Sequence, residues 1–204
     1  METNEKTMKK LDAVEASVWI NAIPVNHEGG KLSGTMTAAV ILMKVAYSRI
    51  AVEFDQAMVN VLKKLKEERF PDFDRMHDDI QKMNEIADRK AQHENWTSDK
   101  PGVPAERPAM PSDEELAEME RIKTTVPDYE AMTQELNLVF REARQLELEK
   151  EVACPGRFSK DQFAELCGFL NGQDAVSVSP PFSAEVQVPI PDFLTQLAMS
   201  VVEQ

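Results

Sequence analysis

The sequence predicts a mainly α protein: an elongated antiparallel or coiled-coil-like helical bundle, with a small C-terminal subdomain containing a β-hairpin. Three observations favour this fold class. The stretch from Thr35 to Arg69 is rich in apolar residues and contains no Gly or Pro. Three separate stretches repeat apolar residues at alternating spacings of three and four, the heptad pattern of packed helices. Two serines stand three positions before a Glu or Gln, the spacing of a capping box.

The first element is predicted as a short helix from Met8 to Ala22. Its apolar residues recur at helical spacing, at Met8, Leu11, Val14 and Val18. Pro24 ends this helix, and the segment around His27 and the following glycines indicates a loop.

The long stretch from Thr35 to Arg69 is predicted as one helix capped by Ser33 or Thr35. At 1.5 Å per residue it would be about 50 Å long. One apolar seam comprises Met36, Val40, Met43, Tyr47, Ile50, Phe54, Ala57 and Val61. A second row, spaced by seven, comprises Ala38, Val45, Val52 and Val59. Because a surface helix needs only one apolar stripe, we expect this helix to be covered on both sides.

A second long helix is predicted from Phe73 to about Glu94, after the break at Phe70-Pro71. Since the connecting turn is short, the two helices are expected to fold back on each other as an αα-hairpin.

The chain is divided by its proline distribution. Pro101, Pro104, Pro108 and Pro111 fall in a stretch without apolar periodicity, which predicts an extended linker. We therefore expect N-terminal helices over residues 1–94, a linker over 95–111, acidic helices completing the bundle over 112–152, and a C-terminal segment over 153–204.

The acidic helices begin with a capping box formed by Ser112 and Glu115. Pro127 is expected to break or kink them. The third heptad seam follows, at Tyr129, Met132, Leu136, Val139, Ala143 and Leu146.

The C-terminal segment is predicted to contain two helices and two strands. Ser159 and Gln162 form a second capping box. Ala175–Val178 and Glu185–Val188 alternate apolar and polar residues, as a hairpin does. Pro191-Asp192 starts a terminal helix.

Charge and composition exclude several function classes. The net charge of -13 makes direct nucleic-acid binding unexpected, because phosphate contacts need clustered Lys and Arg. The richest apolar run, Ala38 to Ala46, is interrupted by Lys44 and is short for a bilayer, so no membrane insertion is expected. Cys154 and Cys167 fit no metal or redox spacing. A cytoplasmic location is the expectation, including a place within an assembled particle.

Asp74, His77 and Asp78 have the spacing of metal ligands on a helix. In the heptad register of their helix, however, both aspartates fall on the outer face. We therefore expect a solvated surface here, and no catalytic, cofactor-binding or metal-binding residues in the chain.

Two carboxylate groups, Glu85-x-x-Asp88 and Glu114-Glu115-x-x-Glu118, resemble pieces of the motifs of all-α nucleoside triphosphate pyrophosphohydrolases. That resemblance implies a metal-dependent nucleotide hydrolase of helical fold. In that family the Glu-Glu-x-x-Glu piece comes first, whereas here the order is reversed. Magnesium would also need carboxylates that converge inward.

The function expected from the sequence is that of a non-enzymatic helical interaction protein, a structural or assembly subunit of a larger complex of viral or secretion type. Its partner would be another protein or further copies of itself. The alternatives are the pyrophosphohydrolase and an acidic inhibitor that mimics nucleic acid. The residues expected to bind a partner are Val45, Val52, Val59, Leu138, Phe140, Leu148, Phe182, Phe193 and Leu197.

Overall fold

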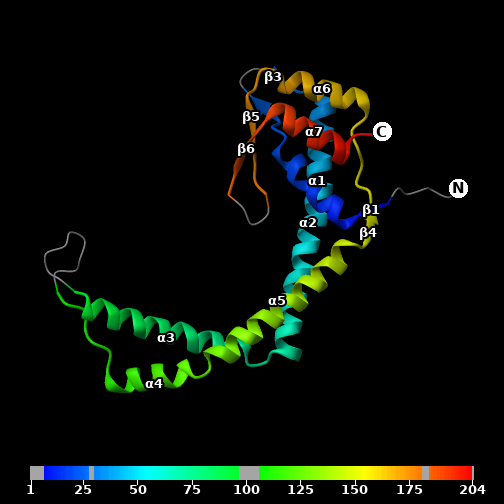
Figure 1. The fold of residues 1–204 in the computed structure, drawn as a ribbon. Helices are drawn as coiled ribbons and strands as arrows, with labels where there is room; N and C mark the ends of the chain where they lie inside the picture. The colour runs from blue at the N-terminus through cyan, green and yellow to red at the C-terminus, as the bar shows by residue number, and fades with distance from the viewer. Residues whose placement is uncertain (1–6, 28–29, 97–105, 181–183, 204) are drawn as a thin grey trace. The chain divides into compact units, whose positions relative to one another are not determined.

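The computed structural model describes residues 7–27, 30–96, 106–180 and 184–203 (Figure 1). It confirms a mainly α protein. Within the described residues the helices are α1 (Lys10–Ala22), α2 (Gly34–Arg69), α3 (Phe73–Glu94), α4 (Asp113–Lys123), α5 (Val126–Leu148), α6 (Lys160–Leu170) and α7 (Ile190–Val201).

The strands form short two-stranded antiparallel sheets. In one, β1 (Thr7–Lys9) pairs with β4 (Glu151–Ala153). In another, β2 (Asn26–His27) pairs with β3 (Gly30–Lys31). The predicted C-terminal hairpin is confirmed as β5 (Ala175–Val178) and β6 (Val186–Pro189), with Val176 opposite Val188.

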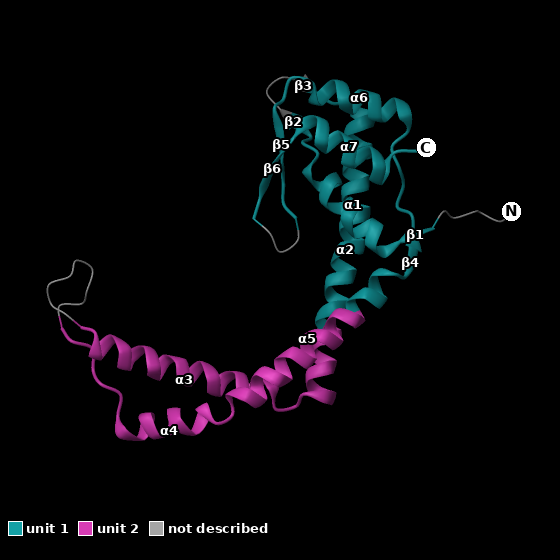
Figure 2. Cartoon of the chain, in the orientation of Figure 1, with its two compact units in different colours: residues 1–59, 144–204 teal, residues 60–143 magenta. Residues whose placement is uncertain are grey.

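The chain forms two compact units (Figure 2). Unit 1 combines residues 1–59 and 144–204, and unit 2 consists of residues 60–143. These units differ from the segments expected from proline content, because two helices, α2 and α5, run from one unit into the other. The composition of a linker cannot mark a boundary that lies inside a helix.

The core of unit 1 forms around the predicted apolar seam of α2. Met36, Val40 and Tyr47 are almost completely buried there. They join one cluster with apolar side chains of α1, α6, α7 and β5, including Ala16, Ile20, Leu166, Val178, Phe193 and Leu197. The C-terminal helix α7 lies against α1. Helices from the two ends of the chain therefore contribute to the same core.

Polar contacts fix the ends of α2 and α1 within this unit. The predicted cap is confirmed, because the Ser33 hydroxyl accepts a 3.1 Å hydrogen bond from the Met36 amide. Lys44 donates through Nζ to the carbonyl oxygens of Asn21 and Ile23, at 3.0 and 2.6 Å. Since these carbonyls lie at the C-terminal end of α1, the lysine satisfies acceptors that the helix leaves unpaired.

The start of the chain differs from the prediction. Met8 belongs to β1, and the helix begins only at Lys10. The pairing partner, β4, lies more than 140 residues away. The salt bridge between Lys10 and Glu147 adds to this junction. Apolar periodicity is local, so it could not reveal a strand whose partner is so distant.

In unit 2, α3 packs along α4. The expected αα-hairpin is therefore corrected: the antiparallel neighbour of α3 is the next helix, not the helix before it. Buried apolar residues of this unit are Met76, Ile86, Met119 and Ile122.

Both predicted capping boxes are confirmed, at Ser112 with Glu115 and at Ser159 with Gln162.

The described part of the predicted linker is attached to α3. The carbonyl oxygen of Pro108 lies 2.7 Å from His93 Nδ1, and Arg107 Nε donates to the His93 carbonyl at 3.0 Å. Residues 97–105 lie outside the described residues.

Candidate interaction surface

A row of exposed aliphatic side chains, interrupted by polar residues such as Arg49 and Gln56, runs along α2 within unit 1. We call it the α2 apolar face, and it comprises Ile41, Leu42, Val45, Val52 and Val59. Leu42 is 69% exposed and Val52 is 65% exposed. In an α-helix, residues seven apart lie almost above one another. The sequence therefore places Val45, Val52 and Val59 on a single line.

The opposite side of the same helix is buried. Phe54 is only 3% exposed, although it lies two residues from Val52. The expectation that α2 is covered on both sides is thus wrong for the single chain. One seam packs into the core, and the row spaced by seven remains at the surface. The pattern correctly indicated two apolar faces on this helix, but it could not indicate that the described residues bury only one of them.

Lys44, Arg49 and Glu53, three charged residues near the α2 apolar face, have partners within the chain. Lys44 is turned toward the end of α1, and its burial lowers the pKa of the ammonium group. Arg49 and Glu53 form an exposed ion pair at 2.8 Å along the helix. Asp55 and Gln56, which lie between Val52 and Val59, are exposed polar residues on the same side of the helix.

The other residues expected to bind a partner divide into two groups. Leu138 is exposed and Phe140 is half-buried on α5. Leu148, Phe193 and Leu197 are instead buried, the last two within the core of unit 1. These three side chains are occupied inside the chain and are not available as a docking surface. Phe182 lies outside the described residues.

Sequence reasoning missed some exposed apolar residues. Leu146, which the third heptad seam places inside, is 66% exposed. Met199 on α7 and Val186 on β6 are also exposed. Leu146 belongs to the last turns of α5, which lie in unit 1, and there Leu148 takes the buried position. A heptad register that fits the middle of a helix does not predict which elements pack against the end of that helix.

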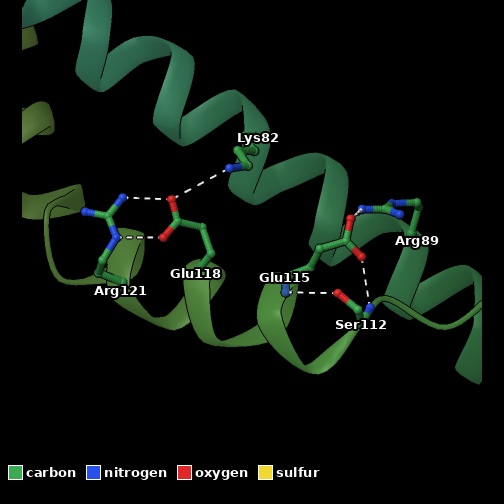
Figure 3. A network of polar contacts seen from close by, with 6 residues as sticks. All are labelled: Lys82, Arg89, Ser112, Glu115, Glu118 and Arg121. Carbon is green, nitrogen blue, oxygen red and sulfur yellow. Dashed lines mark hydrogen bonds and ion pairs between the residues drawn. The ribbon is translucent and has the colours of Figure 1, made fainter.

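Two of the carboxylates that resemble the hydrolase motif, Glu115 and Glu118, form ion pairs between α3 and α4 (Figure 3). Glu115 accepts from Arg89 at 2.5 Å and from the Ser112 amide at 2.9 Å. Glu118 accepts two hydrogen bonds from Arg121, at 2.7 and 2.8 Å, and lies 3.7 Å from Lys82.

These partners determine how the two carboxylates ionise. Hydrogen bonds from Arg121 lower the pKa of Glu118 to about 2. The guanidinium of Arg89 likewise lowers the pKa of Glu115. Glu85 and Asp88 are exposed on α3. The acidic groups are thus already paired with cations or spread over the surface.

Two of the three α3 residues with metal-like spacing, Asp74 and His77, make contacts with nearby side chains. Asp74 pairs with Lys66 at 2.6 Å. His77 Nδ1 lies 2.7 Å from the Tyr129 hydroxyl on α5, and Phe73 packs against both rings. Asp78 is exposed. Among the described residues there is no group of three or more His, Cys, Asp or Glu side chains that could hold a metal ion.

The helix α2 is long and apolar enough to cross a membrane, judged by length and composition alone. The sequence-based expectation considered only the run from Ala38 to Ala46. The apolar part of the helix is longer than that run. Core helices of soluble proteins that are mostly buried meet the same criterion, whereas 22% of the most apolar window of α2 is buried. Here the buried seam of α2 and the contacts of Lys44 join the helix to the core of unit 1.

Comparison of the chain with known protein families, curated proteins and solved structures finds no match.

Proposed function

We propose that the chain is a non-enzymatic helical interaction protein, a structural or assembly subunit that docks to a protein partner through the α2 apolar face. The single observation that carries the proposal is the exposure of this row on a helix whose other side forms the core of unit 1. Exposed apolar surface of this kind is typical of interaction sites.

The packing and hydrogen bonds of α2 within unit 1 support this role. The buried seam, the Ser33 cap and the Lys44 contacts position the helix before any partner arrives. Because the surface is already ordered, docking would cost little conformational entropy in the backbone.

The magnitude of the driving force suits a reversible contact. Full burial of a Val, Leu or Ile side chain contributes about 1.5–3 kcal/mol. The five side chains of the face are roughly half to two-thirds exposed, so covering them contributes on the order of 5 kcal/mol before the costs of association.

The spacing of the face favours a helix as the docking element. Rows of apolar residues at seven-residue intervals fit between the side chains of a facing helix. The proposed partner therefore presents an apolar helical stripe about as long as the face.

The arrangement of charges also favours a binding role over catalysis. Glu115 and Glu118 are neutralised by Arg89, Arg121 and Lys82 (Figure 3). The same interleaving of bases with acids counts against an acidic mimic of nucleic acid. Cys154 and Cys167 are free thiols, which agrees with the proposed cytoplasmic location, alone or within an assembled particle.

The proposal can be tested by replacing Val52 with a photoreactive amino acid and irradiating the cell that expresses the protein. The matched control carries the same group at Met199, which is 66% exposed and lies in the same unit. We expect one dominant protein adduct from position 52 and none from position 199. Equal adduct formation at both positions, or none at position 52, would contradict the proposal.

A further inference from the structure

We infer that unit 1 binds a small amphipathic amine, an organic cation with an apolar body, in a groove between α1, α7 and the β5–β6 hairpin. The groove has a volume of about 470 Å³, which lies within the range of small-molecule sites in proteins. Its lining shares no residue with the α2 apolar face, so the inference goes beyond the proposed function.

The hairpin and helix α1 supply the apolar walls of the groove (Figure 1). Val178 and Val186 are directly paired across the hairpin, and Val188 follows on β6 on the same face of the sheet. Val18 and Trp19 of α1 line the other side. These walls favour a ligand with an apolar body, because covering them removes aliphatic and aromatic surface from water.

The core of unit 1 holds these walls in place before a ligand arrives. Val178 is buried, while Trp19 and Val188 pack against the core cluster. The ring of Trp19 lies 6.1 Å from the ring of Phe193, which is completely buried. A groove that is already formed costs little reorganisation when it binds a ligand.

The polar part of the lining favours a positive charge. Glu15 on α1 and Gln196 on α7 also line the groove, and no basic residue does so among the described residues. In the part of the chain that the structure describes, the Glu15 carboxylate has no ion-pair partner. Glu15 and Trp19 are four residues apart and so are neighbours on the helix surface. A carboxylate and an indole ring both attract an ammonium group, and the Gln196 carbonyl can accept one of its hydrogen bonds.

The strand β6 makes an added peptide strand the less suitable occupant. This strand has four residues and ends at Pro189. Pro189 has no backbone N–H to donate to another strand. A small ligand that lies in the groove does not depend on such hydrogen bonds.

Isothermal titration calorimetry of the full chain tests the site and its preference for a cation. The probes are 4-phenylbutylamine, 4-phenylbutanol and 4-phenylbutyrate, which share an apolar body and differ in the end group. We expect saturable binding of the amine, with a dissociation constant on the order of 0.1–1 mM. The alcohol should bind about fivefold more weakly, and the carboxylate more weakly still. No saturable binding of the amine, or equal binding of the three probes, would overturn the inference.

The Glu15→Gln variant removes the carboxylate and keeps the shape of the side chain. It should bind the amine about fivefold more weakly than the natural chain does and should no longer distinguish it from the alcohol. The matched control is Asp12→Asn, which removes an exposed carboxylate from the same helix outside the groove. This control should bind like the natural chain. An unchanged affinity of Glu15→Gln for the amine would overturn the assignment of the cation to this groove.

Trp19 fluorescence tests where the amine binds. The chain has two tryptophans, so a Trp96→Phe variant leaves Trp19 as the single indole. The amine should change its emission with the same midpoint as in calorimetry. Unchanged emission of Trp19 in a chain that binds the amine would overturn the inference.

The Val52→Asp variant separates this site from the α2 apolar face and leaves both tryptophans in place. It should bind the amine like the natural chain, because Val52 does not line the groove. Loss of amine binding in this variant would move the site to the α2 apolar face and overturn the inference. The crosslinking test of the proposed function does not depend on this result.

Discussion

The hydroxyl of Tyr47 donates a 2.8 Å hydrogen bond to the carbonyl oxygen of Gly156, 109 residues along the chain. It links the middle of α2 to the connection between β4 and α6. The Tyr47 side chain is completely buried, and burial raises the pKa of its phenol. This contact fixes α2 in unit 1 and so defines which of its faces stays outside.

Removing this hydroxyl should weaken unit 1 without changing its shape. The Tyr47→Phe variant keeps the ring but leaves the Gly156 carbonyl without its donor. We expect a loss of about 1–2 kcal/mol in the free energy of unfolding, measured by urea denaturation. Tyr47→Ala, which also removes the ring, should cost more, about 3–5 kcal/mol. Equal stability of the Phe variant and the natural chain would show that the bond contributes nothing.

The C-terminal helix should behave as part of the core. Phe193 is fully buried and its ring lies 6.1 Å from that of Trp19. Phe193→Ala should therefore cost about 3–5 kcal/mol, whereas Met199→Ala on the same helix should change stability by less than about 0.5 kcal/mol. Thermal and urea unfolding of the two variants provide the comparison. Similar small effects for both would mean that α7 does not stabilise unit 1.

Local signals in the sequence predicted most of the elements. Helix α2, both capping boxes and the β5–β6 hairpin follow from spacing and turn chemistry that act over a few residues. The β1–β4 pairing and the joining of both chain ends in unit 1 were not predicted. Those features depend on contacts between distant residues, and apolar periodicity carries no information about partners.

The candidate surface was predicted only in part, for the same reason. Periodicity marked Val52 and Phe193 equally as apolar and in need of cover. The structure buries Phe193 and exposes Val52. Which apolar face the chain covers by itself depends on how many other elements reach it, and that follows from the topology.

The ion pairs between α3 and α4 should make unit 2 sensitive to acid. Arg121 lowers the pKa of Glu118 to about 2, and Arg89 lowers that of Glu115. A carboxylate whose pKa is lower in the folded state stabilises that state above its unfolded pKa, 4.5 here. The contribution is therefore lost as the pH falls from about 4.5 toward 2.

Glu118→Gln should flatten this dependence, because the variant has no carboxylate to protonate. Melting temperatures measured between pH 6 and pH 2 at low ionic strength should fall less steeply for the variant than for the natural chain. Since these groups are exposed, added salt should reduce the difference. An identical slope for the two proteins would show that the pair has no influence on stability.

The carboxylates of α3 should not bind a catalytic metal. A variant with Asp74→Asn, Asp78→Asn, Glu85→Gln and Asp88→Asn should fold nearly as stably as the natural chain, because these side chains are exposed. Magnesium or manganese ions should not raise the melting temperature of either protein, since stabilisation by a ligand requires specific binding to the folded state. A saturable rise that disappears in the variant would revive the nucleotide hydrolase.

We propose that a partner covers the α2 apolar face when the protein is at work. Alkylation of a Val52→Cys variant, followed by peptide mass analysis, tests it most directly. We expect rapid alkylation of the dilute purified chain, where position 52 is exposed, and strong protection in the cell that expresses it. A Met199→Cys control should react in both settings. Equal reactivity of position 52 in the cell and in dilute solution would contradict the claim.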